Sequence, residues 1–147
     1  MSPSPEPPSS DESPRPVVHV LIDEAFFRDR AVAALQALQI QALLPADWPE
    51  DVAALVERVA AVPAAGAVVD LEAEAFSGVD VAAALRADPR CSGWHLLCYS
   101  GGEDEVLDAR AVAAGLEVVP RSSFAANLVR LLGAFRGDLP GPGGLTA

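Results

Sequence analysis

The feature that most constrains the fold is a regular alternation of short apolar segments with longer amphipathic ones along the middle of the chain. The short segments are rich in Val, Leu, Ile and Ala and have the length of strands rather than helices. Their near-continuous apolarity is typical of parallel strands that are buried on both faces. The predicted strands are 17–22, 40–44, 67–71, 94–99 and 116–119.

Each apolar segment is followed by a segment in which apolar residues recur at helical spacing. The third of these ends before Pro89, because the residue before a proline disfavours the helical conformation. The fourth ends at Gly115, a residue type that often terminates helices, and Ser122 or Ser123 is placed to cap the fifth. The fourth predicted helix spans 103–114. The apolar positions of the other four include Phe27, Ala31, Ala34, Leu35 and Leu38; Val52, Leu55, Val56 and Val59; Val79, Ala82 and Leu85; and Phe124, Leu128, Leu131, Leu132 and Phe135.

Five strands that alternate with five helices predict an α/β fold in three layers. Crossover connections between parallel strands are right-handed and place helices on both faces of the sheet. We expect the strand order 2-1-3-4-5, which places functional groups at the carboxyl ends of the strands, where the strand order reverses.

The 147 residues suffice for one domain, which we place at 17–136. Residues 1–16 are rich in Pro, Ser and acidic residues, and 137–147 in Gly and Pro. Such compositions bury little apolar surface, so we expect two disordered tails. The first of them lacks the basic start and apolar core of a signal peptide, and no apolar run is long enough to span a membrane, so a cytoplasmic location is expected.

The charge of the chain argues against binding to nucleic acids or to anionic membranes. The formal net charge is −11 at neutral pH, all ten basic residues are Arg, and there is no Lys. A strongly negative protein repels phosphate groups.

A zinc site at Cys91, His95 and Cys98 is not favoured. His95 and Cys98 are three residues apart on one predicted strand and therefore point to opposite faces of the sheet. Two cysteines in and beside an apolar segment are more typical of buried thiols than of a disulfide.

Polar residues stand where the predicted strands end. Asp23 and Glu24 follow the first strand, and Asp70 lies in the third, directly after three apolar residues. With the first and third strands adjacent, these three carboxylates converge and repel one another. A hard divalent cation with oxygen ligands would relieve that repulsion, so Mg²⁺ is the predicted metal.

At this point the chain resembles the receiver domains of bacterial two-component response regulators, over about residues 17–135. The resemblance is carried by HVLIDE, VVDLEAEAFSG and LCYSGG, in that order and spacing. It implies a flavodoxin-like receiver fold, with Asp23 and Glu24 as the acidic metal-binding pair and Asp70 as the phosphoaccepting aspartate. It also implies Ser100 as the hydroxyl residue of the fourth strand, Gly78 as the glycine that opens the third helix, and the backbone carbonyl of Glu72 as a further Mg²⁺ ligand.

The chain also departs from this pattern. Receivers carry a Lys at the end of the fifth strand, whereas this chain has Pro120 and Arg121 there, so only Arg121 is available for that role. The fifth strand offers Glu117, Val118 and Val119 in place of the usual aromatic residue. These differences predict that an activation relay would be impaired.

Simpler roles remain open for two of these residues. Asp23 is also suited to cap the first helix, and Ser100 with Glu103 matches a helix-capping box, S-x-x-E. Asp70 is harder to explain in this way, since an acid beside an apolar layer needs a specific reason.

The interpretation we favour is an atypical receiver-like module that is not an enzyme and acts through protein–protein interaction, with weak Mg²⁺-dependent phosphorylation at Asp70. A histidine kinase or an output protein supplied in trans is the expected partner. The alternatives are a fully functional phosphoacceptor in a phosphorelay and a flavodoxin-like protein that binds a small ligand. The chain lacks the G-x-S-x-G motif of hydrolases and the Lys of a phosphate-binding loop.

Overall fold

The computed structural model describes residues 15–136, and every helix and strand lies between Val17 and Arg136. Apart from residues 15 and 16, the two predicted tails lie outside the described residues. The elements in chain order are β1 (Val17–Leu21), α1 (Ala25–Ala37), β2 (Gln41–Leu43), α2 (Val52–Ala60), β3 (Gly66–Asp70), α3 (Gly78–Ala87), η2 (Pro89–Cys91), β4 (His95–Ser100), α4 (Glu105–Ala113), β5 (Val118–Pro120), α5 (Arg121–Ala126), α6 (Leu128–Gly133) and η3 (Ala134–Arg136).

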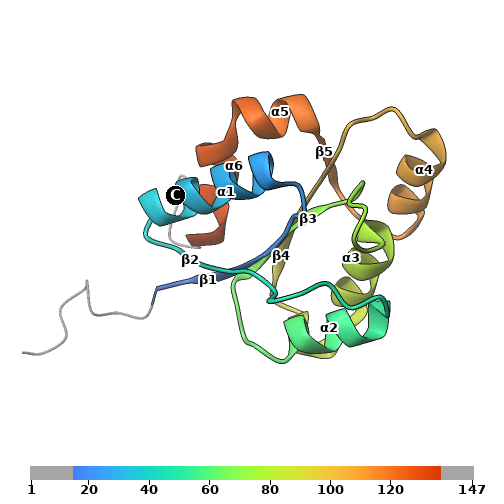
Figure 1. Ribbon diagram of the computed structural model, residues 1–147, viewed down its shortest axis with the longest axis horizontal. Helices are drawn as coiled ribbons and strands as arrows, with labels where there is room; N and C mark the ends of the chain where they lie inside the picture. The colour runs from blue at the N-terminus through green and yellow to red at the C-terminus, as the bar shows by residue number, and fades with distance from the viewer. Residues whose placement is uncertain (1–14, 137–147) are drawn as a thin grey trace, which may run out of the picture.

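The five strands form one parallel sheet in the order β2-β1-β3-β4-β5, which confirms the predicted topology. Helices α1, α5 and α6 lie on one side of the sheet and α2, α3 and α4 on the other (Figure 1). β1, β3 and β4 are the three central strands, and their middle residues are buried. The fold is therefore the predicted three-layer α/β sandwich.

Two apolar clusters fill the layers between the sheet and its helices. Alternate residues of each central strand contribute to opposite clusters, as the pleat of a strand requires. Val69 and Cys98 pack with α2, α3 and α4, whereas Val68 and Tyr99 pack with α1, α5 and α6. The face to which a strand residue points thus decides which helices it can contact.

The number of helices differs from the prediction because the last helix is interrupted. Asn127 has φ of −121°, which ends α5 and separates it from α6. Its side-chain amide donates to the carbonyl of Ser123 at 3.1 Å and compensates for part of the interruption. The apolar face predicted for this segment still holds, since Phe124, Leu128 and Leu132 are buried.

The helix-capping predictions were wrong in three places. Glu24 rather than Asp23 caps α1, accepting hydrogen bonds from the amides of Phe26 and Phe27. Asp104 rather than Ser100 caps α4, which begins at Glu105 and not at Glu103. No side chain caps α5, because it begins at Arg121 and thus includes both Ser122 and Ser123.

Cys91, His95 and Cys98 do not gather. Cys98 is buried against the α2–α4 side of the sheet, whereas the His95 ring lies beside Phe135 with 4.9 Å between ring centres. Among residues 15–136, no helix combines the length and apolarity that a membrane span requires.

Candidate functional site

The carboxyl ends of the strands bring most of the predicted site residues together at one edge of the sheet, here called the carboxyl edge. Asp70 ends β3, and Asp23 and Arg121 follow β1 and β5. The charges of Arg121, Asp23 and Glu72 all act on the Asp70 carboxylate. Asp23, Asp70, Glu72 and Arg121 therefore lie close enough at this edge for their charges to act on one another.

Asp70 is the most buried carboxylate of this edge, with 6% of its surface exposed. Its Oδ1 accepts a hydrogen bond of 2.9 Å from the amide of Glu72. Burial raises the pKa of Asp70 above its ordinary value, and the Glu72 amide and Arg121 only partly oppose this effect. A carboxylate held in this way is under-solvated and incompletely paired.

Asp23 and Glu24 each bind backbone amides. Asp23 Oδ2 accepts hydrogen bonds from the amides of Glu74 and Ala75, at 3.0 and 2.8 Å. Asp23 thereby ties β1 to the loop that follows β3. Glu24 is exposed and caps α1 with both of its carboxylate oxygens, so the two neighbouring acids have different structural roles.

Glu72 and Arg121 form an ion pair across the site, from the loop after β3 to the start of α5. Glu72 Oε1 accepts from Arg121 Nη2 and also from the Gly101 amide, the latter at 3.0 Å. A Cβ at Gly101 would lie 2.7 Å from Arg121 Nη1, so a side chain there would displace the end of the Arg121 side chain. The guanidinium therefore lies against the backbone just after β4 and neutralises Glu72 directly.

As arranged, these side chains do not form a ready-made site for a divalent cation. No group of three His, Cys, Asp or Glu residues within 15–136 is placed to hold a metal ion. Glu24 uses both oxygens as a helix cap, and Arg121 already neutralises Glu72. A Mg²⁺ ion with the carboxylates of Asp23, Glu24 and Asp70 and the backbone carbonyl of Glu72 as ligands remains a prediction, and it would require the hydrogen bonds of Asp23 and Glu24 to be exchanged.

Ser100 ends β4 but its hydroxyl group points away from Asp70. The hydroxyl donates to Asp108 Oδ1 at 2.9 Å, and Asp108 belongs to α4, on the other side of the sheet from α1 and α5. Ser100 thus links the end of β4 to α4.

The residue that lies beside Asp70 on β4 is Tyr99, which sequence reasoning did not select. Asp70 and Tyr99 are register partners in the parallel pair β3–β4. Register partners in adjacent strands point to the same face of the sheet. The alternation of Cys98, Tyr99 and Ser100 between the two faces of the sheet is visible in the sequence. It identifies Tyr99 as the neighbour of Asp70 only when the register of β3 and β4 is known.

A hollow of about 350 Å³ adjoins this edge on the α3–α4 side. Its polar lining comes from Glu72, Ser77, Asp104 and Arg110. Arg110 forms an ion pair of 2.6 Å with Asp80 of α3, and Ser77 donates to the same carboxylate at 2.9 Å. These contacts connect α3 to α4 beside the site.

No protein-family model and no curated protein matches the sequence. Solved structures, in contrast, match the fold over most of the chain. One is the receiver domain of a sensor histidine kinase from Pseudomonas aeruginosa, with a magnesium ion coordinated in its active-site cleft. It has a TM-score of 0.67 at 15% identity, over 85% of this chain and 100% of that one.

Two further structures give the same result. The receiver domain of the NarL response regulator of Mycobacterium tuberculosis matches with a TM-score of 0.62 at 23% identity, over 85% of this chain and 98% of that one. A sensor protein from a Polaromonas species matches with a TM-score of 0.64 at 22% identity, over 85% of this chain and 98% of that one. The chain therefore has the fold of the receiver domains of two-component signalling proteins, as its sequence motifs predicted.

Proposed function

We propose that this chain is an atypical receiver-like signalling module that acts mainly by binding another protein, and in which Asp70 is a poor phosphoacceptor. The observation that carries the proposal is the state of Asp70 and its neighbours. Asp70 stands buried at the end of the central strand of a receiver fold, while Arg121, the one guanidinium of residues 15–136 that acts on it, is already paired with Glu72.

Phosphorylation of Asp70 would add negative charge to an already acidic edge. In that reaction an Asp70 oxygen forms a bond to the phosphorus of the donor as the bond from phosphorus to the leaving group breaks. The product carries close to two negative charges, which need compensating cations. Arg121 can supply this charge only by leaving Glu72, and that exchange exposes a second uncompensated acid.

The negative charges of Asp23 and Glu72 act on Asp70, and each of these two carboxylates already accepts a hydrogen bond from a backbone amide. We therefore expect Mg²⁺ to bind weakly, because it must compete with the amides of Glu74 and Ala75 for Asp23 and is repelled by the positive charge of Arg121. Mg²⁺-dependent phosphorylation should accordingly be slow and incomplete.

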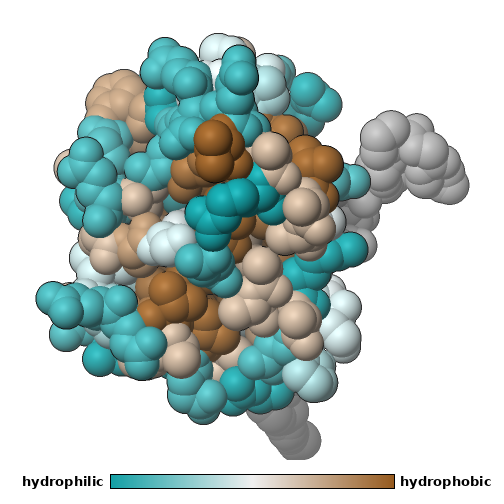
Figure 2. Space-filling model, turned by 90° about the vertical axis from the view of Figure 1, so that its right-hand side faces the viewer, coloured by the Kyte–Doolittle hydropathy of each residue, from teal (hydrophilic) through white to brown (hydrophobic). Residues whose placement is uncertain are grey.

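Binding to a partner is supported by the surface next to the site. Figure 2 shows the side of the molecule on which α3 and α4 lie, where apolar residues are exposed among polar ones. Val106 and Val112 of α4 are exposed over 72% and 71% of their surfaces. Because Ser100 holds Asp108 of the same helix, a partner bound to α4 would be in contact with an element attached to the site.

Intact-mass measurement after incubation with acetyl phosphate, with and without Mg²⁺, tests this proposal. We expect only a small fraction of the chain to gain one phosphoryl group, and none in Asp70→Asn. Arg121→Lys is the matched comparison, since it keeps the charge but replaces the planar guanidinium with a flexible ammonium.

Stoichiometric, long-lived modification of the parent chain would contradict the proposal. It would favour a fully functional phosphoacceptor, which in a cell would receive its phosphoryl group from a histidine kinase or another member of a phosphorelay.

A further inference from the structure

Tyr99 and Asp70 are the two incompletely paired polar residues of the carboxyl edge, and they lie next to each other. They are register partners on β3 and β4 and point to the same face of the sheet. The Tyr99 hydroxyl is buried and has no hydrogen-bond partner among the described residues. Asp70 accepts through Oδ1 from the Glu72 amide, and Oδ2 has no hydrogen bond within the same range.

The ring of Tyr99 is held firmly in place, so its hydroxyl has little freedom to find another partner. The residue is fully buried, and its ring stacks on Phe124 of α5 with 4.2 Å between ring centres and 16° between planes. Phe27 of α1 lies on the same side of the sheet, with its ring centre 6.0 Å away.

The electrostatics identify the hydroxyl as a donor rather than an acceptor. Burial first, and then the negative charge of Asp70, raise the pKa of the Tyr99 phenol above its ordinary value. The phenol therefore keeps its proton at neutral pH. Buried hydroxyl groups are nearly always paired, and the neighbouring carboxylate has an oxygen to accept this proton.

We propose that Tyr99 is the positioning residue of Asp70: its phenol hydroxyl donates to the free Asp70 oxygen and must be displaced before any group is added there. This inference rests on the proposed function for its consequence, the poor reactivity of Asp70. It places the hydroxyl of Tyr99 beside Asp70, whereas the resemblance implied Ser100 as the hydroxyl residue of the fourth strand. It also provides a cause of low reactivity that is independent of Arg121.

The chain contains one Tyr, which makes a direct test practicable. Labelling tyrosine with ¹³C at Cζ gives a single NMR signal, whose position responds to hydrogen bonding of the phenol. We expect Asp70→Asn to shift this signal. Asp108→Asn is the matched control, since Asp108 binds Ser100 on the other side of the sheet, and it should leave the signal in place.

A second measurement tests the consequence. Tyr99→Phe removes the hydroxyl and keeps the stacked ring, so incubation with acetyl phosphate should modify it several-fold faster than the parent chain. A Tyr99 signal that is the same in the parent and in Asp70→Asn would overturn the contact. Equal rates for Tyr99→Phe and the parent would overturn its protective role.

These outcomes are distinguishable from failure of the proposed function. Stoichiometric modification of the parent chain would contradict the proposed function, while the NMR comparison would still decide the Tyr99 contact. Conversely, a poorly modified parent with an unresponsive Tyr99 signal would leave the proposed function standing and remove this inference.

Discussion

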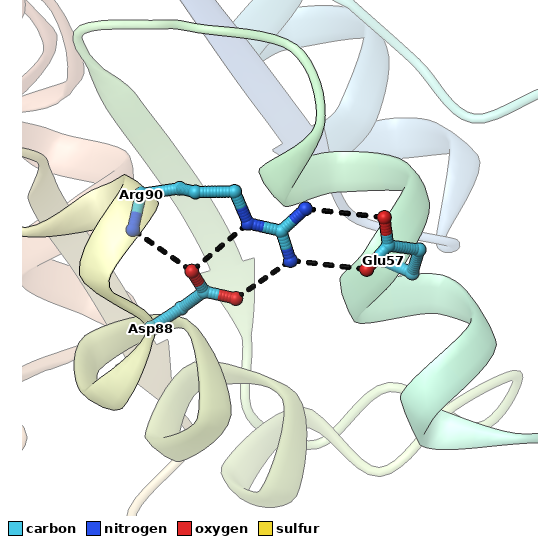
Figure 3. Close-up of polar contacts among 3 residues, drawn as sticks. All are labelled: Glu57, Asp88 and Arg90. Carbon is cyan, nitrogen blue, oxygen red and sulfur yellow. Dashed lines mark hydrogen bonds and ion pairs between the residues drawn. The ribbon is translucent and has the colours of Figure 1, made fainter.

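The two edges of the sheet each contain an arginine paired with carboxylates, and the two arrangements differ in how completely their polar groups are satisfied. At the amino edge, where the strands begin, Arg90 is bonded to both Glu57 and Asp88 (Figure 3). Its Nη1 and Nη2 donate to the two oxygens of Glu57, and its Nε and Nη2 to those of Asp88. At the carboxyl edge, Arg121 pairs with only one oxygen of Glu72.

The difference extends to the neighbouring residues. The hydrogen bonds from Arg90 lower the pKa of both Glu57 and Asp88, so these acids are stabilised as ions. At the carboxyl edge burial raises the pKa of Asp70, and the Tyr99 hydroxyl has no hydrogen-bond partner within 15–136. Unsatisfied buried groups cost stability, and functional sites are where proteins tolerate that cost. The acids of the amino edge are thus fully paired and those of the carboxyl edge are not, which supports the site proposed above at the carboxyl edge.

The largest expected effect on stability comes from a substitution at Gly78, beside the carboxyl edge. Gly78 opens α3 directly against the end of β3, and a Cβ there would lie 2.4 Å from the Asp70 carbonyl oxygen and 2.6 Å from Leu71 Cα. Because backbone atoms cannot yield cheaply, Gly78→Ala should lower the free energy of unfolding by about 2–3 kcal/mol. Urea denaturation measures the loss.

Gly93→Ala is the matched control, because nothing lies within 4 Å of a Cβ at Gly93 in the loop before β4. Its free energy of unfolding should stay within about 0.5 kcal/mol of the parent value. If Gly78→Ala were equally harmless, α3 would not be packed against the site as closely as described.

A smaller effect of opposite sign is expected from the buried acid itself. Asp70→Asn removes a charge whose burial raises its pKa, so it should increase the free energy of unfolding at pH 7 by about 1 kcal/mol. The folded chain binds this proton more strongly than the unfolded chain does. The destabilisation by Asp70 is therefore absent below pH about 4 and grows as the pH rises through the folded-state pKa.

Urea denaturation of the parent and of Asp70→Asn at several pH values measures this difference. The two stabilities should converge in acid and separate toward neutrality. Asp88→Asn is the control at the other edge, and it should destabilise instead, because Arg90 lowers the pKa of Asp88. A loss of stability in Asp70→Asn at neutral pH would mean that the two edges do not differ in the way described.

Much of the fold was predictable from the sequence, because the signals that specify it are local. The apolar segments and their spacing predicted the strands to within about two residues. The order 2-1-3-4-5 was expected as a common order of doubly wound α/β sheets. The position of Asp70 followed directly, since a charged residue after three buried ones marks the end of a strand. These inferences required no knowledge of how one strand aligns with the next.

The details of the site depend on that alignment. The fourth strand was predicted to end at Tyr99, and the resemblance implied that Ser100, one residue further along, supplies the hydroxyl group of the site. In a strand, a shift of one residue exchanges the two faces, so Ser100 contacts Asp108 of α4 while Tyr99 lies beside Asp70. Similarly, the pairing of Glu72 with Arg121 joins segments 49 residues apart, and no local pattern reveals it.

A pH-dependent effect at the amino edge should be smaller than that of Asp70. His19 is buried there and stacks on Trp94 with 5.3 Å between ring centres. Its Nε2 lies 3.1 Å from the carbonyl oxygen of Val62. Burial lowers the pKa of His19, so the unfolded chain binds this proton more strongly. The contribution of His19 to stability is complete above pH about 6.5 and is lost as the pH falls toward the folded-state pKa.

Burial also lowers the pKa of His95, so the pH dependence of the stability of the parent chain contains contributions from both histidines. Comparing the parent with His19→Gln isolates the first, since the variant keeps His95. We expect the parent to lose more stability than His19→Gln between pH 7 and pH 5 in thermal denaturation. Equal losses would show that the contacts of His19 are insensitive to its protonation.

The smallest effect is expected from the arginine with the most hydrogen bonds. Arg90→Gln removes the contacts of Figure 3, but Arg90 and Glu57 are largely exposed, with 45% and 66% of their side-chain surfaces accessible. Water and salt screen such pairs, and ordering the long side chains offsets part of the attraction. The thermal midpoint of Arg90→Gln should lie only slightly below that of the parent in low salt, and the difference should vanish in about 1 M NaCl.

Arg121→Gln provides the comparison at the other edge, where the partner Glu72 is only 21% exposed and also holds the Gly101 amide. Its effect should persist in salt, because a half-buried pair is screened less and removing the guanidinium leaves Glu72 beside Asp70 uncompensated. If the two variants responded to salt alike, burial would not distinguish the two arginines, and the contrast between the exposed, fully paired amino edge and the buried, incompletely paired carboxyl edge would lose its electrostatic basis.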